Sequence, residues 1–137
     1  MGARYYLKAY LAGIATPTVF LLLFVSGFTV ARHLWEVPGP AERVIIFPMA
    51  ILPNLWGVWN VLLAWTRRRR PVSSGAFGAM LPLIVAPIAY LITRIAGVEL
   101  PPFLVRVFPM AFVTVVGVYY LLWKYVVQFL NDLVETG

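Results

Sequence analysis

The side chains best placed to bind a solute within this chain are two amides, Asn54 and Asn60, in an otherwise apolar run. A carboxamide offers two N–H donors and one carbonyl acceptor. Leaving such a group unpaired in hydrocarbon costs several kcal/mol, so each amide needs a partner. A neighbouring helix is the simpler partner, and a ligand or ion is the more specific one.

Prolines and small residues accompany these amides. Prolines interrupt the apolar runs at Pro17, Pro48, Pro53, Pro82, Pro87 and Pro109. Interrupted helices in corresponding halves of a membrane protein indicate a transport site, although proline is also common in membrane helices generally. Small or polar residues recur at helical spacing, which favours close helix packing or the lining of a cavity. The candidate pore-lining or substrate-binding residues are therefore Asn54, Asn60, Thr114, Pro53, Gly57 and Gly117.

Several other chemistries are excluded by residue type. The chain has no cysteine, and its one histidine, His33, lies beside a charged residue at the end of an apolar run. Thiolate metal sites and disulfides are therefore excluded, and we expect no metal and no cofactor. No glycine-rich phosphate loop or Ser/His/Asp set is present, so we expect no catalytic residues and no enzyme activity. The long apolar runs also lack a carboxylate that could carry protons.

The elements that hold these residues follow from composition. Of the 137 residues, 62% are hydrophobic and 12% are charged, against about 25% charged in a soluble domain. A soluble domain and a disordered chain are both excluded. Uncharged or nearly uncharged runs predict spans at about 9–31, 44–66, 71–93 and 107–127. A run of 23 residues makes a helix of about 34 Å, enough to cross about 30 Å of hydrocarbon.

Loop charges predict the orientation of these spans. With both termini cytoplasmic, seven Lys and Arg residues face inward and four face outward, as the positive-inside bias requires. Arg67, Arg68, Arg69 and Arg70 occupy the short loop after the second span. We interpret this run as an orientation signal that also contacts acidic lipid headgroups, and we expect no nucleic-acid partner. A plasma or inner membrane location follows.

The two halves of the chain resemble each other. Residues 36–50 and 99–111 share an order of acid, aliphatic, proline, arginine, valine and Phe-Pro-Met-Ala. The match places Glu36 beside Glu99 and Arg43 beside Arg106 in the alignment, as an outer rim of charges. We therefore predict one all-α, polytopic membrane domain over 1–137, with four transmembrane helices in two tandem, parallel-repeat hairpins, at about 5–66 and 72–130.

Two functions remain compatible with this sequence. The first is a small permeation or transport module that acts as a homo-oligomer and uses the proline-broken helices with Asn54 and Asn60. The second is an accessory or assembly subunit whose small-residue faces dock a larger membrane-protein partner. Duplication and paired prolines favour the first, and the lack of charge in the spans favours the second. Both place the chain in a lipid bilayer, and neither names a substrate.

Overall fold

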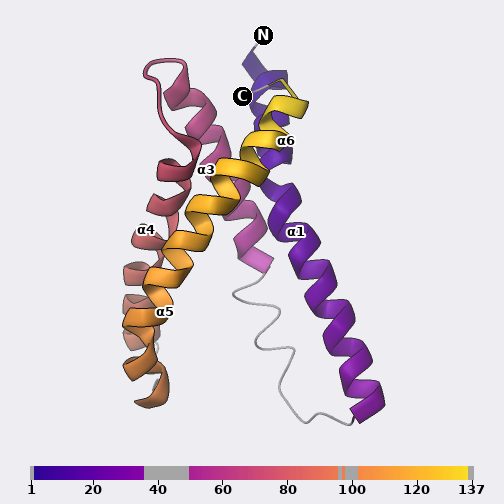
Figure 1. Ribbon diagram of the computed structural model, residues 1–137, viewed down its shortest axis with the longest axis vertical. Helices are drawn as coiled ribbons and strands as arrows, with labels where there is room; N and C mark the ends of the chain where they lie inside the picture. Colours follow the sequence, from indigo (N-terminus) through magenta and orange to yellow (C-terminus); the bar gives the residue numbers. More distant parts are fainter. Residues whose placement is uncertain (1, 36–49, 96, 98–101, 136–137) are drawn as a thin grey trace. The chain divides into compact units, whose positions relative to one another are not determined.

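The computed structural model describes residues 2–35, 50–95, 97 and 102–135, and all the regular secondary structure in these ranges is helical (Figure 1). Two long helices are α1 (Gly2–Trp35) and α4 (Ser74–Ile95), with α3 (Ala50–Arg67) between them in the sequence. Beyond α4, the helix α5 (Pro102–Leu121) continues through a π-helical turn, η2 (Leu122–Val127), into α6 (Gln128–Leu133). The all-α class is confirmed.

Three stretches are long and apolar enough to cross a membrane: Gly2–Trp35, Ser74–Ile95 and Val105–Leu133. The prediction of membrane-compatible helices is confirmed for these three. The remaining predicted span, 44–66, begins outside the described residues, and α3 contributes 18 residues from Ala50 onward. A count of four spans therefore stays a prediction. The first helix is longer than its predicted span because helical hydrogen bonding continues through the charged residues at both ends of the apolar run.

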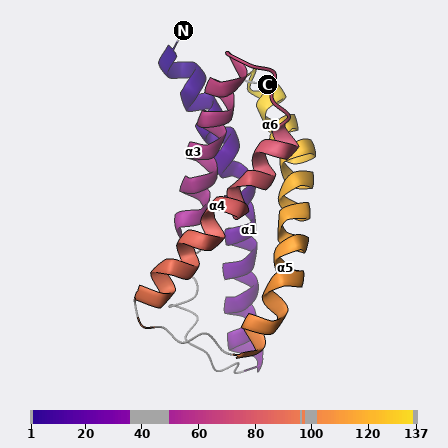
Figure 2. The same cartoon turned by 90° about the vertical axis from the view of Figure 1, so that its left-hand side faces the viewer.

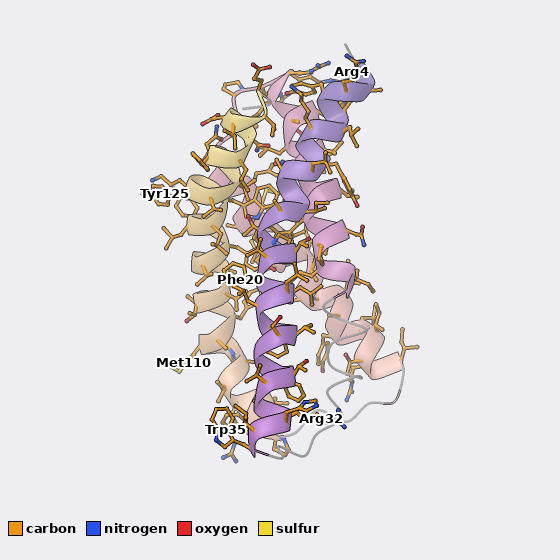
Figure 3. The ribbon with its side chains drawn as sticks, turned by 90° about the vertical axis from the view of Figure 1, so that its right-hand side faces the viewer. Arg4, Phe20, Arg32, Trp35, Met110 and Tyr125 are labelled. Atoms are coloured by element: carbon orange, nitrogen blue, oxygen red, sulfur yellow. The ribbon has the colours of Figure 1, made fainter. Side chains whose placement is uncertain are left out.

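The chain forms two compact units, and the first consists of residues 1–69 with 129–137. In this unit α1 and α3 run side by side in antiparallel directions (Figures 1 and 2). Figure 3 shows Arg4 at one end of α1 and Arg32 at the other. Ala9 of α1 lies opposite Asn60 of α3, and Gly13 lies opposite Trp56. These two contacts define the register of the helices.

Glycine allows the close approach of α1 and α3. A methyl group added at Gly13 would lie 2.7 Å from the Trp56 carbonyl oxygen and 2.8 Å from the Gly57 Cα. A methyl group at Gly57 would meet the Tyr10 ring and the Ile14 side chain. Backbone-to-backbone proximity of this kind maximises dispersion contacts where lipid supplies no hydrophobic driving force. Among the small residues of the predicted second span, Gly57 therefore faces another helix rather than lipid.

The second unit, residues 70–128, pairs α4 with α5 and η2. Here the small residues lie on α4: Gly78 faces the Trp123 side chain, and Gly75 faces the Tyr120 ring and the Lys124 Cβ. A π-helical turn inserts extra backbone per turn, and within it Trp123 and Val127 are both fully buried. The two units thus use different packing chemistry, and their relation as a tandem repeat stays a prediction. Much of its first motif, residues 36–49, lies outside the described residues.

Prolines inside helices are observed at every predicted position that the described ranges include. Pro17 lies in α1, Pro53 in α3, Pro109 in α5, and both Pro82 and Pro87 in α4. Each removes one backbone donor from its helix. In α1 this leaves the Gly13 carbonyl without its usual helical donor, because Pro17 is four residues further along.

Two glycines of α1 test the importance of close approach. Gly13→Ala should lower the free energy of unfolding by about 1–3 kcal/mol, because the added methyl group overlaps backbone atoms of α3. Gly27→Ala is the matched control: nothing lies within 4 Å of an added methyl group there, so stability should stay unchanged or rise by about 0.5–1 kcal/mol. Circular dichroism during unfolding in mixed detergents measures both. Equal changes in the free energy of unfolding for Gly13→Ala and Gly27→Ala would contradict the close packing of α1 against α3 at Gly13.

Candidate functional site

The first unit contains a buried pair of amides. Asn60 Nδ2 donates to the Ala9 carbonyl oxygen at 2.7 Å and to Asn131 Oδ1 at 2.7 Å. In return, Asn131 Nδ2 donates to Asn60 Oδ1 at 3.0 Å. Asn60 is 0% exposed and Asn131 is 2% exposed. We call Asn60, Asn131 and the Ala9 carbonyl the amide clasp. It joins α1, α3 and α6 within this unit.

The clasp uses the hydrogen-bonding capacity of Asn60 internally. A carboxamide has two N–H donors, and both donors of Asn60 have protein acceptors. Buried amides that lost these partners would retain the full desolvation cost of burial. Asn60 therefore fits the simpler of its two predicted uses, hydrogen bonding between helices.

Asn131 is a site residue that sequence reasoning missed. It follows the last predicted span and precedes Asp132, so it resembles a solvated chain end. The available signal was spacing: Trp123, Val127 and Asn131 recur every fourth residue, and all three are buried. A helical continuation past residue 127 places them along one face.

Two other candidates on α3, Asn54 and Gly57, contact α1 as well. Tyr10 Oη donates to Asn54 Oδ1 at 2.6 Å, although Asn54 is exposed. Gly57 packs against the same tyrosine ring. Pro53, beside Asn54, is partly exposed. The structure thus brings Asn54, Gly57 and Asn60 together along the line where α3 meets α1, in the first unit.

The candidates on α5 belong to the second unit. Thr114 is exposed and its hydroxyl donates to the Met110 carbonyl oxygen at 3.1 Å, a bond within its own helix. Gly117 is exposed, and nothing lies within 4 Å of a methyl group added there. Met110, Val113, Thr114 and Gly117 share a helical face. This face of α5 is open to a lipid or to another protein.

Of the predicted outer rim, only Arg106 lies within the described residues, where it is exposed on α5. Glu36, Arg43 and Glu99 lie outside them. Among the residues that the structure describes, no group of three or more His, Cys, Asp or Glu side chains is arranged to hold a metal ion.

Three residues of the arginine run, Arg67, Arg68 and Arg69, belong to the first unit and lie near the first turns of α1 and the end of α6. Arg67 is half-buried, and burial lowers its pKa, while the negative charge of Asp132 acts in the opposite direction. Lys8 Nζ lies 3.6 Å from Glu135 Oε2, a surface ion pair that contributes little to stability. These contacts place the C-terminal residues against the start of α1 and the end of α3.

Arg68 and Arg69 contact aromatic rings instead. The Arg68 guanidinium carbon lies 4.2 Å from the centroid of the Tyr5 ring and 5.2 Å from that of Tyr6. The Arg69 guanidinium carbon lies 4.2 Å from the Trp65 ring. We call Arg68 and Arg69, with the rings of Tyr5, Tyr6 and Trp65 that they contact, the ring-supported arginine pair. Arg70, next in the chain, is exposed.

The amide clasp can be tested by a double-mutant cycle. Asn131→Leu should lower the free energy of unfolding by about 1–3 kcal/mol, because it leaves the buried Asn60 amide with fewer partners. Asn60→Leu should have a similar cost. The double variant should cost less than the sum of the two, since both polar groups are then removed. Unfolding in mixed detergents provides the measurement, and strictly additive losses would contradict a direct amide pair.

The site is thus a pair of packed helices fastened by buried amides, with a basic rim at one end. Comparisons of the chain with known protein families, with curated proteins and with solved structures give no match.

Proposed function

We propose that this chain is a non-enzymatic accessory or assembly subunit of a larger membrane complex. The observation that carries the proposal is the closure of the amide clasp: both donors of Asn60 bind protein acceptors inside the first unit. The polar groups predicted to contact a solute instead hold α1, α3 and α6 together. A firmly packed unit of this kind is suited to anchoring and positioning a partner.

The docking face of this subunit is the open side of α5. Met110 is 80% exposed and Val113 is 72% exposed, and the exposed residues Thr114 and Gly117 follow them about one turn further along the same face. Small residues next to large apolar ones let a second helix approach closely in a bilayer. The chemistry of this face matches a transmembrane helix of a partner.

A small permeation module that works as a homo-oligomer is the second candidate. Thr16, 7% exposed, has a buried hydroxyl oxygen without a hydrogen-bond partner among the described residues. It precedes Pro17, which leaves the nearby Gly13 carbonyl without its helical donor. A hydroxyl and a carbonyl in this state favour a solute or water within the first unit. In this candidate the open face of α5 binds a second copy of the chain.

Site-specific photocross-linking in native membranes distinguishes the two candidates. A photoreactive amino acid at Val113, on the open face of α5, should give a product with a different integral membrane protein, identified by mass spectrometry. The same label at Leu23, which is 65% exposed on α1, controls for contact at any lipid-facing position. A product at twice the mass of the chain from Val113 alone would contradict the accessory role and support the oligomer.

We also infer that both termini and the arginine run lie in the cytoplasm of a plasma or inner membrane. The contact between Lys8 and Glu135 supports a common side for the two termini. The ring contacts of Arg68 with Tyr5 and Tyr6 support the same side for the arginine run. A cluster of positive charge at one end of a helix pair follows the positive-inside bias.

Because the chain has no cysteine, single cysteines report this orientation without background. Ser73→Cys, next to the arginine run, should resist a membrane-impermeant maleimide added to intact cells. Phe103→Cys, exposed at the start of α5, should react. Both should react after permeabilisation, which controls for accessibility. The reverse pattern in intact cells would contradict the proposed orientation.

A further inference from the structure

The basic end of the first unit contains two kinds of cation. Lys8 and Arg67 face carboxylates, those of Glu135 and Asp132 respectively. Arg68 and Arg69 lie over aromatic rings. Positive charge on the first kind is partly neutralised within the protein, whereas charge on the second kind is available to an external anion. This difference between carboxylate-paired and ring-contacting cations does not depend on the proposed accessory role.

Ring contacts position the two guanidinium groups. Each lies 4.2 Å from a ring centroid, well within the roughly 6 Å range of a cation–π interaction. The Tyr5 and Tyr6 rings meet edge-to-face, with centroids 5.4 Å apart and an interplanar angle of 80°. A guanidinium that contacts a ring through its face keeps its N–H groups free along its edge. Those N–H groups form a planar fork that matches two oxygens of a phosphate.

The location of the pair indicates where such a phosphate comes from. Trp65 is 41% exposed and lies near the end of α3, and Tyr5 and Tyr6 lie in the first turns of α1. Tryptophan and tyrosine at the ends of apolar helices occupy the headgroup level of a bilayer. Guanidinium groups on their rings are then at the depth of the lipid phosphates. The formal net charge of the chain, +6, favours an anionic lipid over a zwitterionic one.

We propose that Arg68 and Arg69, supported by the rings of Tyr5, Tyr6 and Trp65, form a binding site for the phosphate of an anionic phospholipid. This phosphate site differs from a simple orientation signal in the residue types that it requires. An orientation signal needs positive charge alone, and lysine supplies that as well as arginine. A phosphate site built on rings needs the planar fork and the aromatic surface beneath it.

Lysine substitutions separate these requirements. The full chain, purified in a mild detergent, is titrated with phosphatidylglycerol or phosphatidylcholine, and bound lipids are counted by native mass spectrometry. The double variant Arg68→Lys/Arg69→Lys should bind phosphatidylglycerol about threefold to tenfold more weakly, with every charge retained. Arg70→Lys, the matched control beside the site, should bind it as the unaltered chain does. Phosphatidylcholine binding should be weak and equal in all of them.

A second variant tests the rings. Trp65→Leu leaves all charges and removes the surface under Arg69, so phosphatidylglycerol binding should weaken in the same direction. Circular dichroism confirms that each variant retains its helix content. Unchanged phosphatidylglycerol binding in Arg68→Lys/Arg69→Lys would overturn the proposal. An equal loss in Arg70→Lys would overturn it too, because that result describes diffuse charge rather than a site.

Discussion

The arrangement of the first unit depends on the cost of burying an amide without partners. Asn60 is completely buried on α3. In such surroundings the amide must be paired, and the available acceptors come from α1 and from α6. The amide therefore selects both the register of α1 against α3 and the position of the C-terminal turn. An apolar residue at position 60 would pack in several registers, whereas a paired amide favours one.

Close approach makes this pairing geometrically accessible. Gly13 lies directly against α3 and lets the two backbones come together. The Ala9 carbonyl, one turn earlier on α1, then lies within 2.7 Å of the Asn60 side chain. The glycine and the amide thus act together: one sets the separation of the helices, and the other sets their relative position along the axis. The second unit packs Trp123 against Gly78 instead, and there the Gln128 side-chain amide accepts a hydrogen bond from the Ser74 hydroxyl.

Sequence patterns predicted helical class and the three membrane-compatible stretches because these depend on local properties, namely run length and charge. The use of Asn60 between helices was one of two predicted uses, but its partner Asn131 was missed. That partner is 71 residues away in the chain, and no local pattern encodes a contact over such a separation. The π-helical turn before α6, in which Trp123 and Val127 are buried, was missed as well. Thr114 and Gly117 share helical spacing with the α3 candidates but belong to the other unit.

The same arginine run serves more than one physical purpose at the end of the first unit. Counting charges treats Arg67, Arg68, Arg69 and Arg70 as equivalent, and for orientation they are. Their surroundings are different: one is half-buried opposite Asp132, two lie on rings, and one is exposed. A guanidinium held over a ring loses less conformational freedom when it binds an anion, because the ring contact already restricts its position. Identical residues at consecutive positions therefore differ in their affinity for phosphate, through the side chains that α1 and α3 place beneath them.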